Sequence, residues 1–355
     1  MEDLICGASA FRLYRVPPAI LALYPPLPNL AGDRHRRMLR CHPLVEEVLG
    51  DPVHLLVEKR SCFTGADHID QHLMTRSLPL GSSIDIEELE LSVTSPIATL
   101  FTIARSVSLP HLIMAMYEFC GSFTLYRPSS SAEKAWSELE RVGSLAQLGG
   151  WRRVTSASGA PSDLWMRPPL LQINELEDFA QSVHGMRYAK RFEDALSLVA
   201  GITASPFETQ AAMLLTLPRI LGGEGLTGFE CNYHLRLTKA AQRIANKEYV
   251  VIDLFHEGDE EGHPPLAIEC QGKLVHDGVD PGISDANRMA ALQTMGIDVL
   301  PLSYRQIADP INFDLVVKLI AKKTCSRLLQ KSKRLIDKQE KLRREIFIDW
   351  LTLGA

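Results

Sequence analysis

Two acidic residues are candidates for metal-dependent chemistry because each lies within an apolar segment that is expected to be buried. Asp253 interrupts the strand-like segment 249–255, and Glu269 interrupts the strand-like segment 266–271. A carboxylate in a core strand is destabilising unless a partner compensates its charge. A divalent cation is one such partner, and Mg²⁺ prefers carboxylate oxygens and water as ligands. The sequence therefore predicts that Asp253 and Glu269 share one Mg²⁺ ion.

Two further side chains are expected beside these carboxylates. Residues two apart on a strand face the same side of a sheet, so Gln271 is expected next to Glu269, where it would orient a water molecule or a phosphate. Cys270 is expected to face the other side. Glu208 follows the pair Ser205-Pro206, which is typical of a helix start. It is a candidate for a third metal ligand or for a residue that supports the ligands.

The surrounding segments predict how these residues are positioned. A polar turn joins the two strands, and Ser284 begins a predicted helix that runs to Met295 and stops at Gly296. Residues 297–302 are expected to form another buried strand. The order helix, strand, hairpin strand, helix, strand predicts an α/β fold with a mixed sheet flanked by helices.

This arrangement resembles the core of the PD-(D/E)XK nucleases. In that superfamily an Asp on one strand and Glu-x-Lys, or a variant of it, on the next strand hold a metal that activates water against a phosphodiester. Residues from about 205 to 307 are similar in particular to the very-short-patch-repair-type endonuclease-like domain of bacterial proteins. The matching stretches are Ser205-Pro206-Phe207-Glu208, Val251-Ile252-Asp253-Leu254, Ala267-Ile268-Glu269-Cys270-Gln271-Gly272, Asp285-Ala286-Asn287-Arg288 and Met295-Gly296-Ile297-Asp298-Val299-Leu300.

The resemblance also assigns roles within the site. The residues that it implies are an acidic cluster of Glu208, Asp253 and Glu269, His276 as a general base or phosphate contact, and Asp285 and Arg288 on a helix that closes the site. Related chains have an Asp or Lys at the position of Gln271. This chain therefore lacks a charge that would help to hold a second metal or to polarise the water.

The N-terminal part carries a second, looser resemblance. Residues 4–125 are similar to AbiEi-like antitoxin and regulator proteins, which often carry this endonuclease-like domain at the C-terminus. The suggestive stretches are residues 5–13 and 93–101, and both are interpreted as packing and capping sequences. The resemblance implies an α+β domain in this part of the chain.

The length of 355 residues predicts more than one domain. Turn and flexible residues are dense between Arg127 and Pro169, which is typical of a connector. The expected parts are an AbiEi-like α+β domain over 1–126, a linker and helical connector over 127–200, an endonuclease-like domain over 201–310 and a basic C-terminal helix over 311–355.

The C-terminal segment is the most basic part of the chain. Residues 318–345 contain eleven Lys or Arg and three Asp or Glu, whereas the whole chain has a formal net charge of −5. Residues 313–353 lack Gly and Pro, and leucines repeat every seven residues, which predicts one long helix, or two joined smoothly, with an apolar seam. Lys331, Lys333 and Arg334 are candidates for contacts with DNA phosphates. The alternatives are a solvated face and a seam that binds a protein partner.

The composition narrows the class of protein. Seven scattered cysteines do not form a disulfide framework. The acidic start is unlike a secretory signal, and no apolar stretch is long enough to span a bilayer. We therefore expect a cytoplasmic protein without a membrane segment. A zinc site is a further alternative, but its candidate ligands match no paired-ligand spacing; these are Cys231, His234, His256 and His263.

Three functions follow from these patterns. The first is a Mg²⁺-dependent endonuclease-like protein that hydrolyses DNA phosphodiester bonds. The second is a catalytically inactive nuclease-fold DNA-binding regulator or antitoxin-like protein, in which Gln271 marks the loss of catalysis. The third is a protein-interaction module that uses the C-terminal helix. The arrangement of Glu208, Asp253 and Glu269 distinguishes the first from the second.

Overall fold

The computed structural model describes eight stretches of the chain, and these form two compact units. The stretches are residues 4–28, 39–59, 67–142, 149–156, 159–258, 263–272, 274–275 and 281–354. The first unit comprises Met1–Arg152, Trp165–Val199 and Asp349–Ala355, and the second comprises Arg153–Leu164 and Ala200–Ile348. The units combine helices with mixed sheets, as expected for the α/β class. Within the described stretches, every helix is too short or too polar to cross a membrane.

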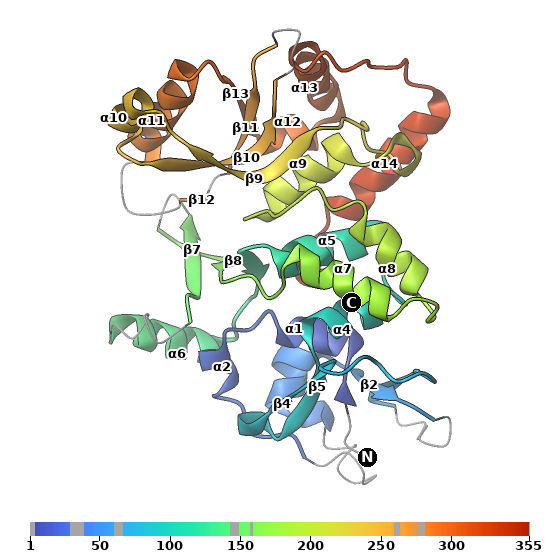
Figure 1. The fold of residues 1–355 in the computed structure, drawn as a ribbon. Coiled ribbons are helices and arrows are strands. Elements are labelled where there is room, and N and C mark those ends of the chain that lie inside the picture. The colour runs from blue at the N-terminus through green and yellow to red at the C-terminus, as the bar shows by residue number, and fades with distance from the viewer. Residues whose placement is uncertain are drawn as a thin grey trace. The chain divides into compact units, whose positions relative to one another are not determined.

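The first unit is built on a five-stranded mixed sheet with the order β3-β2-β1-β5-β4 (Figure 1). β1 pairs in parallel with β5 and β2 pairs in parallel with β3, whereas the β1–β2 and β4–β5 pairs are antiparallel. The strands are β1 (Leu4–Ile5), β2 (Val53–Val57), β3 (Ile69–Leu73), β4 (Ser83–Ile86), β5 (Leu91–Thr94) and β6 (Phe123–Leu125). The α-helices are α1 (Gly7–Leu13), α2 (Pro18–Leu21), α4 (Pro96–Ile103), α5 (Leu109–Cys120), α6 (Ser130–Arg141), α7 (Ile173–Ser182) and α8 (Ala189–Leu196).

Aromatic side chains fill much of the core of the first unit. Phe11 of α1 stacks on Phe119 of α5 with ring centroids 4.9 Å apart, and Trp136 meets Trp165 edge to face at 4.7 Å. Such pairs add a directional term to the burial of apolar area. The predicted helix start at Ser95-Pro96 is present as the start of α4, although the Ser95 side chain makes no capping bond.

The second unit contains a four-stranded mixed sheet with the order β13-β11-β10-β9. β9, β10 and β11 form an antiparallel meander, and β13 lies parallel to β11. The strands of this sheet are β9 (Phe229–Arg236), β10 (Tyr249–His256), β11 (Leu266–Gln271) and β13 (Asp298–Ser303). β7 (Arg152–Ser156), β8 (Pro161–Met166) and β12 (Leu274–Val275) belong to another sheet. The α-helices are α9 (Pro206–Thr216), α10 (Lys239–Ala245), α11 (Pro281–Thr294), α12 (Tyr304–Ala308), α13 (Pro310–Lys323) and α14 (Lys333–Ile346). The strands expected around Asp253 and Glu269 and the helix expected at Ser205 are all present.

Helices cover both sides of this sheet. α10 and α11 pack together, and a cluster that includes Ala241, Leu292, Phe255 and Ala267 joins them to β10 and β11. α9 also contacts β10 and β11, and Figure 1 shows it on the other side of the sheet from α10 and α11. The predicted end of the helix before Gly296 is confirmed: α11 ends at Thr294, and Gly296 has a φ of +77°.

The C-terminal segment does not form one smooth helix. α13 ends at Lys323 and α14 begins at Lys333, where the Ser332 hydroxyl accepts a bond from Leu335 N–H and caps the new helix. The predicted seam is present in α14 as buried Leu335 and Leu342. It packs against the turn at Gly222, where a Cβ atom would lie 2.4 Å from the Lys338 carbonyl oxygen. The seam is thus occupied by the chain's own second unit.

Candidate functional site

Asp253 lies at the point where β10 and β11 stop forming a regular ladder. Leu254 pairs with Ile268 across the two strands. Beyond this pair, the N–H of Cys270 in β11 donates to Asp253 Oδ2 in β10 at 2.6 Å. The carboxylate therefore takes the place of a backbone carbonyl as the acceptor. Such a charge-assisted bond stabilises the ionised carboxylate and fixes its orientation along the plane of the sheet.

Glu208 lies in the first turn of α9 and closes a reciprocal cap. Its N–H donates to Ser205 Oγ at 3.2 Å, and the Ser205 hydroxyl donates to Glu208 Oε1 at 2.7 Å. Glu208 Oε2 accepts from Ala204 N–H at 2.6 Å. Both carboxylate oxygens thus accept hydrogen bonds from the residues at the start of the helix. Burial, together with the negative charge of Asp253, raises the pKa of Glu208 to about 8.

Glu269 is buried and forms an ion pair with α11. Its side chain is 2% exposed, and Glu269 Oε2 lies 2.8 Å from Arg288 Nη2. Arg288 Nη1 also donates to the Val251 carbonyl at 3.3 Å. Because α11 covers the side of the sheet on which Ala267 packs, and Glu269 is two residues further along the strand, Glu269 faces that side too.

The predicted acidic cluster is therefore divided between the two faces of the sheet. Cys270 points away from Glu269, and burial with the nearby charges of Asp253 and Glu208 raises the pKa of its thiol well above its usual range. Glu208 begins α9, which lies on the other side of the sheet from α11, the helix that Glu269 contacts. Among the His, Cys, Asp and Glu residues that the structure describes, these three carboxylates do not form a set of mutually close ligand atoms. The structure brings Asp253 near Glu208 but does not bring all three together.

The structure describes only some of the remaining candidate residues of the site. Gln271 ends β11 with an exposed side chain. His276 and the side chain of Asp285 lie outside the described residues. His263, one of the alternative zinc ligands, instead contacts Cys325, with 2.7 Å between Nε2 and Sγ.

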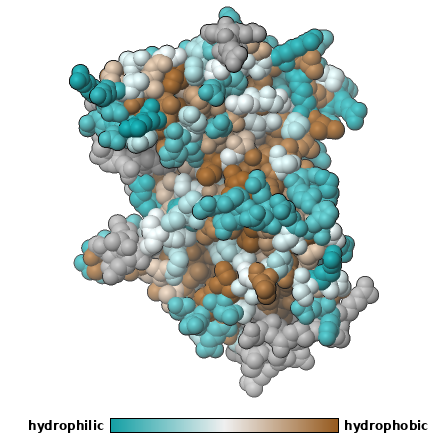
Figure 2. All heavy atoms as spheres, viewed as in Figure 1, coloured by the Kyte–Doolittle hydropathy of each residue, from teal (hydrophilic) through white to brown (hydrophobic). Residues whose placement is uncertain are grey.

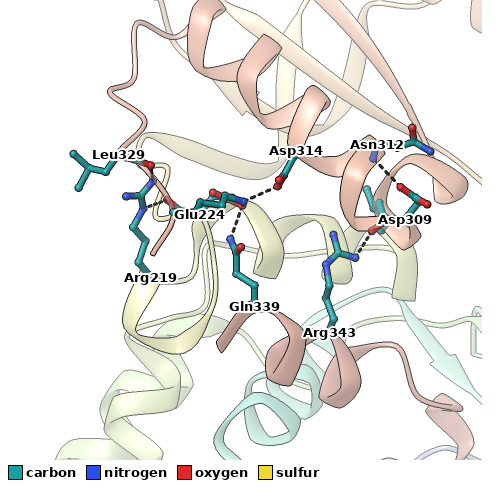
Figure 3. A network of polar contacts seen from close by, with 10 residues as sticks. Arg219, Glu224, Asp309, Asn312, Asp314, Leu329, Gln339 and Arg343 are labelled. Atoms are coloured by element: carbon teal, nitrogen blue, oxygen red, sulfur yellow. Dashed lines mark hydrogen bonds and ion pairs between the residues drawn. The ribbon is translucent and has the colours of Figure 1, made fainter. Parts of the chain in front are cut away.

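Lys331 is partly buried and is bound to two carboxylates of the second unit. Its Nζ lies 2.7 Å from Glu224 Oε1 and 2.6 Å from Asp314 Oδ1. Gln339 of α14 donates to the same Glu224 oxygen at 2.7 Å. Figure 3 shows Glu224, Asp314 of α13 and Gln339 of α14 converging. Glu224 is buried, so the Lys331 ammonium compensates the charge of a buried carboxylate. Its role is therefore structural, and it is not a free contact for DNA phosphates.

The exposed basic groups lie further along the C-terminal helix. Lys333 and Arg334 of the first turn of α14 are exposed, as expected from the sequence. Lys341 and Arg344, two turns later, are exposed as well and extend this surface. We call these four residues the basic face of α14. Figure 2 shows hydrophilic side chains along the edge of the second unit where Figure 1 draws the segment between α13 and α14.

A second cluster, absent from the sequence-based expectations, lies in the first unit. His54 Nδ1, Asp70 Oδ2 and His72 Nε2 are mutually close, and within the described residues this is the single group of three or more such side chains with metal-binding geometry. Its residues come from two strands that pair in parallel, β2 and β3. The sequence signal was Asp70-x-His72, a spacing that places both side chains on one face of a strand.

Comparisons with protein-family models, with curated proteins and with solved structures found no match to this chain. The functional argument therefore depends on the geometry of these residues.

Proposed function

We propose that this protein binds DNA through the basic face of α14 and that its second unit is a nuclease-type scaffold, of the PD-(D/E)XK kind, without an assembled catalytic centre. The observation that carries this proposal is the contrast between two sets of charges. The four residues of the basic face of α14 are exposed, whereas Glu208, Asp253 and Glu269 are bound to partners within the unit. Exposed Lys and Arg on a helix supply sequence-independent affinity for phosphates.

The order of elements supports the nuclease-type assignment of the scaffold. α9, β10, its hairpin partner β11, α11 and the parallel strand β13 follow the order expected for that core, and β9 and α10 are additional elements between α9 and β10. Asp253 and Glu269 lie within the adjacent strands β10 and β11, and two acids on neighbouring strands are what the resemblance implies. A DNA-binding regulator or antitoxin-like protein is the function that this combination favours.

A comparison of two charge-matched variants tests the proposal. In the α14 variant, Lys333, Arg334, Lys341 and Arg344 are replaced by Gln. In the α10 control, four other exposed basic residues of the same unit are replaced by Gln: Arg236, Lys239, Arg243 and Lys247. Fluorescence anisotropy with a short labelled duplex is expected to show weaker binding for the α14 variant and near wild-type binding for the control. Equal losses in the two variants would contradict a defined DNA surface.

Mg²⁺-dependent hydrolysis is the second candidate function, and the proximity of Glu208 to Asp253 favours it. Burial has the largest effect on the pKa of Glu208, and the negative charge of Asp253 raises this pKa further. A bound cation would reduce the repulsion between the two carboxylates. Plasmid nicking with and without Mg²⁺ distinguishes the two functions. We expect no Mg²⁺-dependent nicking by the wild type. Nicking that disappears in Asp253→Asn, with the fold intact, would establish the enzyme.

A further inference from the structure

Two parallel strands place three potential metal ligands on one face of the first unit. In the pairing of β2 with β3, His54 lies beside Asp70 and Leu56 lies beside His72. Asp70 and His72 are two residues apart and therefore point to the same side. Val53 and Leu55, which alternate with His54, are buried in the core of the unit. The three polar side chains therefore occupy the opposite face of these strands.

The ligand atoms have the separations that a small metal ion requires. His54 Nδ1 and His72 Nε2 are 2.7 Å apart, and Asp70 Oδ2 lies 3.5 Å from each of them. Ligands that bind Zn²⁺ tetrahedrally at about 2.0–2.1 Å lie roughly 3.3–3.4 Å from one another. The two distances to Asp70 are close to this value, and the two imidazole nitrogens need to separate by about 0.6–0.7 Å.

We propose that His54 Nδ1, Asp70 Oδ2 and His72 Nε2 bind one divalent transition-metal ion, with Zn²⁺ as the ion that fits this donor set. Two imidazoles and one carboxylate suit Zn²⁺ and neighbouring first-row ions better than Mg²⁺ or Ca²⁺, which prefer oxygen ligands. Three protein ligands leave a coordination position for water or for another ligand.

The hydrogen bonds of His72 show which ring nitrogen carries the proton and which bond a metal ion would have to break. Arg105 Nη1 lies 3.1 Å from His72 Nδ1, and a guanidinium can only donate. His72 Nδ1 is therefore the acceptor, so the ring proton is on Nε2, from which it is donated to His54 Nδ1. A metal bound at Nε2 of a neutral His72 ring requires this proton to move to Nδ1, which can then no longer accept from Arg105. Arg105 must then release the ring, so Arg105 competes with the metal.

Arg105 also lines a cavity of about 600 Å³ in the same unit. Arg76 and Arg187 contribute two more guanidinium groups to its wall. When Arg105 leaves His72, its guanidinium remains beside a cavity whose charge suits an anion. After leaving the ring, the Arg105 guanidinium can therefore donate its hydrogen bonds to an anion in this cavity.

The test measures metal binding by the full-length chain, with no assay of activity. We titrate metal-free protein with Zn²⁺ by calorimetry and record the visible spectrum of the Co²⁺ form, which reports the ligand geometry. The expected result is one tightly bound ion per chain, lost in Asp70→Asn and in His54→Gln. Asp70 is exposed, with 47% of its side chain accessible, so Asp70→Asn leaves the fold intact. Arg105→Leu is expected to bind the metal about tenfold more tightly, because it removes one competing hydrogen bond.

Two controls separate this site from others that attract zinc. His68→Gln removes an exposed histidine on the same unit, bonded to Asp51, and is expected to bind the ion normally. Cys325→Ser breaks the exposed Cys325–His263 pair in the second unit and removes the competing thiol. The proposal is overturned if the wild type binds no Zn²⁺, or if Asp70→Asn and His54→Gln bind it as the wild type does.

Discussion

Arg288 Nη2 lies 2.8 Å from Glu269 Oε2, so the carboxylate that the sequence predicts as a metal ligand is paired with a guanidinium. Glu269 is nearly inaccessible, whereas Arg288 retains 31% exposure. A buried carboxylate that loses its cationic partner is destabilising, because desolvation is no longer offset. The ion pair thus links β11 to α11 and explains how an acid is tolerated in this core strand.

Arg288→Gln is expected to lower the free energy of unfolding of the second unit by about 1–3 kcal/mol. Adding Glu269→Gln is expected to recover part of the loss, since the uncompensated charge is removed as well. Urea unfolding followed by circular dichroism measures both effects. All four Trp residues belong to the first unit, so Trp fluorescence follows that unit separately. A double variant no more stable than Arg288→Gln would contradict the charge argument.

Glu208 is expected to make the stability of the second unit depend on pH. Its pKa in the folded chain is about 8, above the value of an ordinary Glu, so the folded state retains a proton that the unfolded state has released. Stability therefore falls as pH rises from the unfolded pKa toward 8, by at most about 1.4 kcal/mol per pH unit. Glu208→Gln is expected to flatten this slope in urea unfolding between pH 5 and pH 8.5. Parallel slopes for the variant and the wild type would exclude Glu208 as the source.

Lys331 and Lys333 are expected to have opposite roles despite their proximity in sequence. Lys331→Gln leaves the buried Glu224 without its ammonium partner and is expected to cost about 2–4 kcal/mol of stability. Lys333→Gln changes an exposed residue and is expected to alter stability by less than about 0.5 kcal/mol. Thermal unfolding of the two variants measures the difference. Similar melting temperatures would show that the network in Figure 3 contributes little.

Local sequence signals predicted the elements of the second unit well. Ser205-Pro206 marked the start of α9, and Gly296 marked the turn after α11. The strands around Asp253 and Glu269 were recognisable because β-branched and apolar residues run continuously through them. These features depend on residues close together in the chain, which is why the sequence alone reveals them.

Features that depend on long-range contacts could not be predicted in this way. The division of Glu208 and Glu269 between two faces depends on where α9 and α11 pack, not on either strand. The break between α13 and α14 depends on Glu224, more than a hundred residues before Lys331. His54 and His72 meet because β2 and β3 pair in parallel, and no local pattern specifies that pairing.

The salt dependence of DNA binding tests the central claim most directly. Each basic side chain that neutralises a phosphate contributes about 0.9 to the slope of log K against log salt concentration. For the α14 variant we expect the slope to be smaller than that of the wild type by up to about 3–4, while the α10 control keeps the wild-type slope. A wild-type slope in the α14 variant would contradict the account, because the basic face of α14 would then make no contact with DNA.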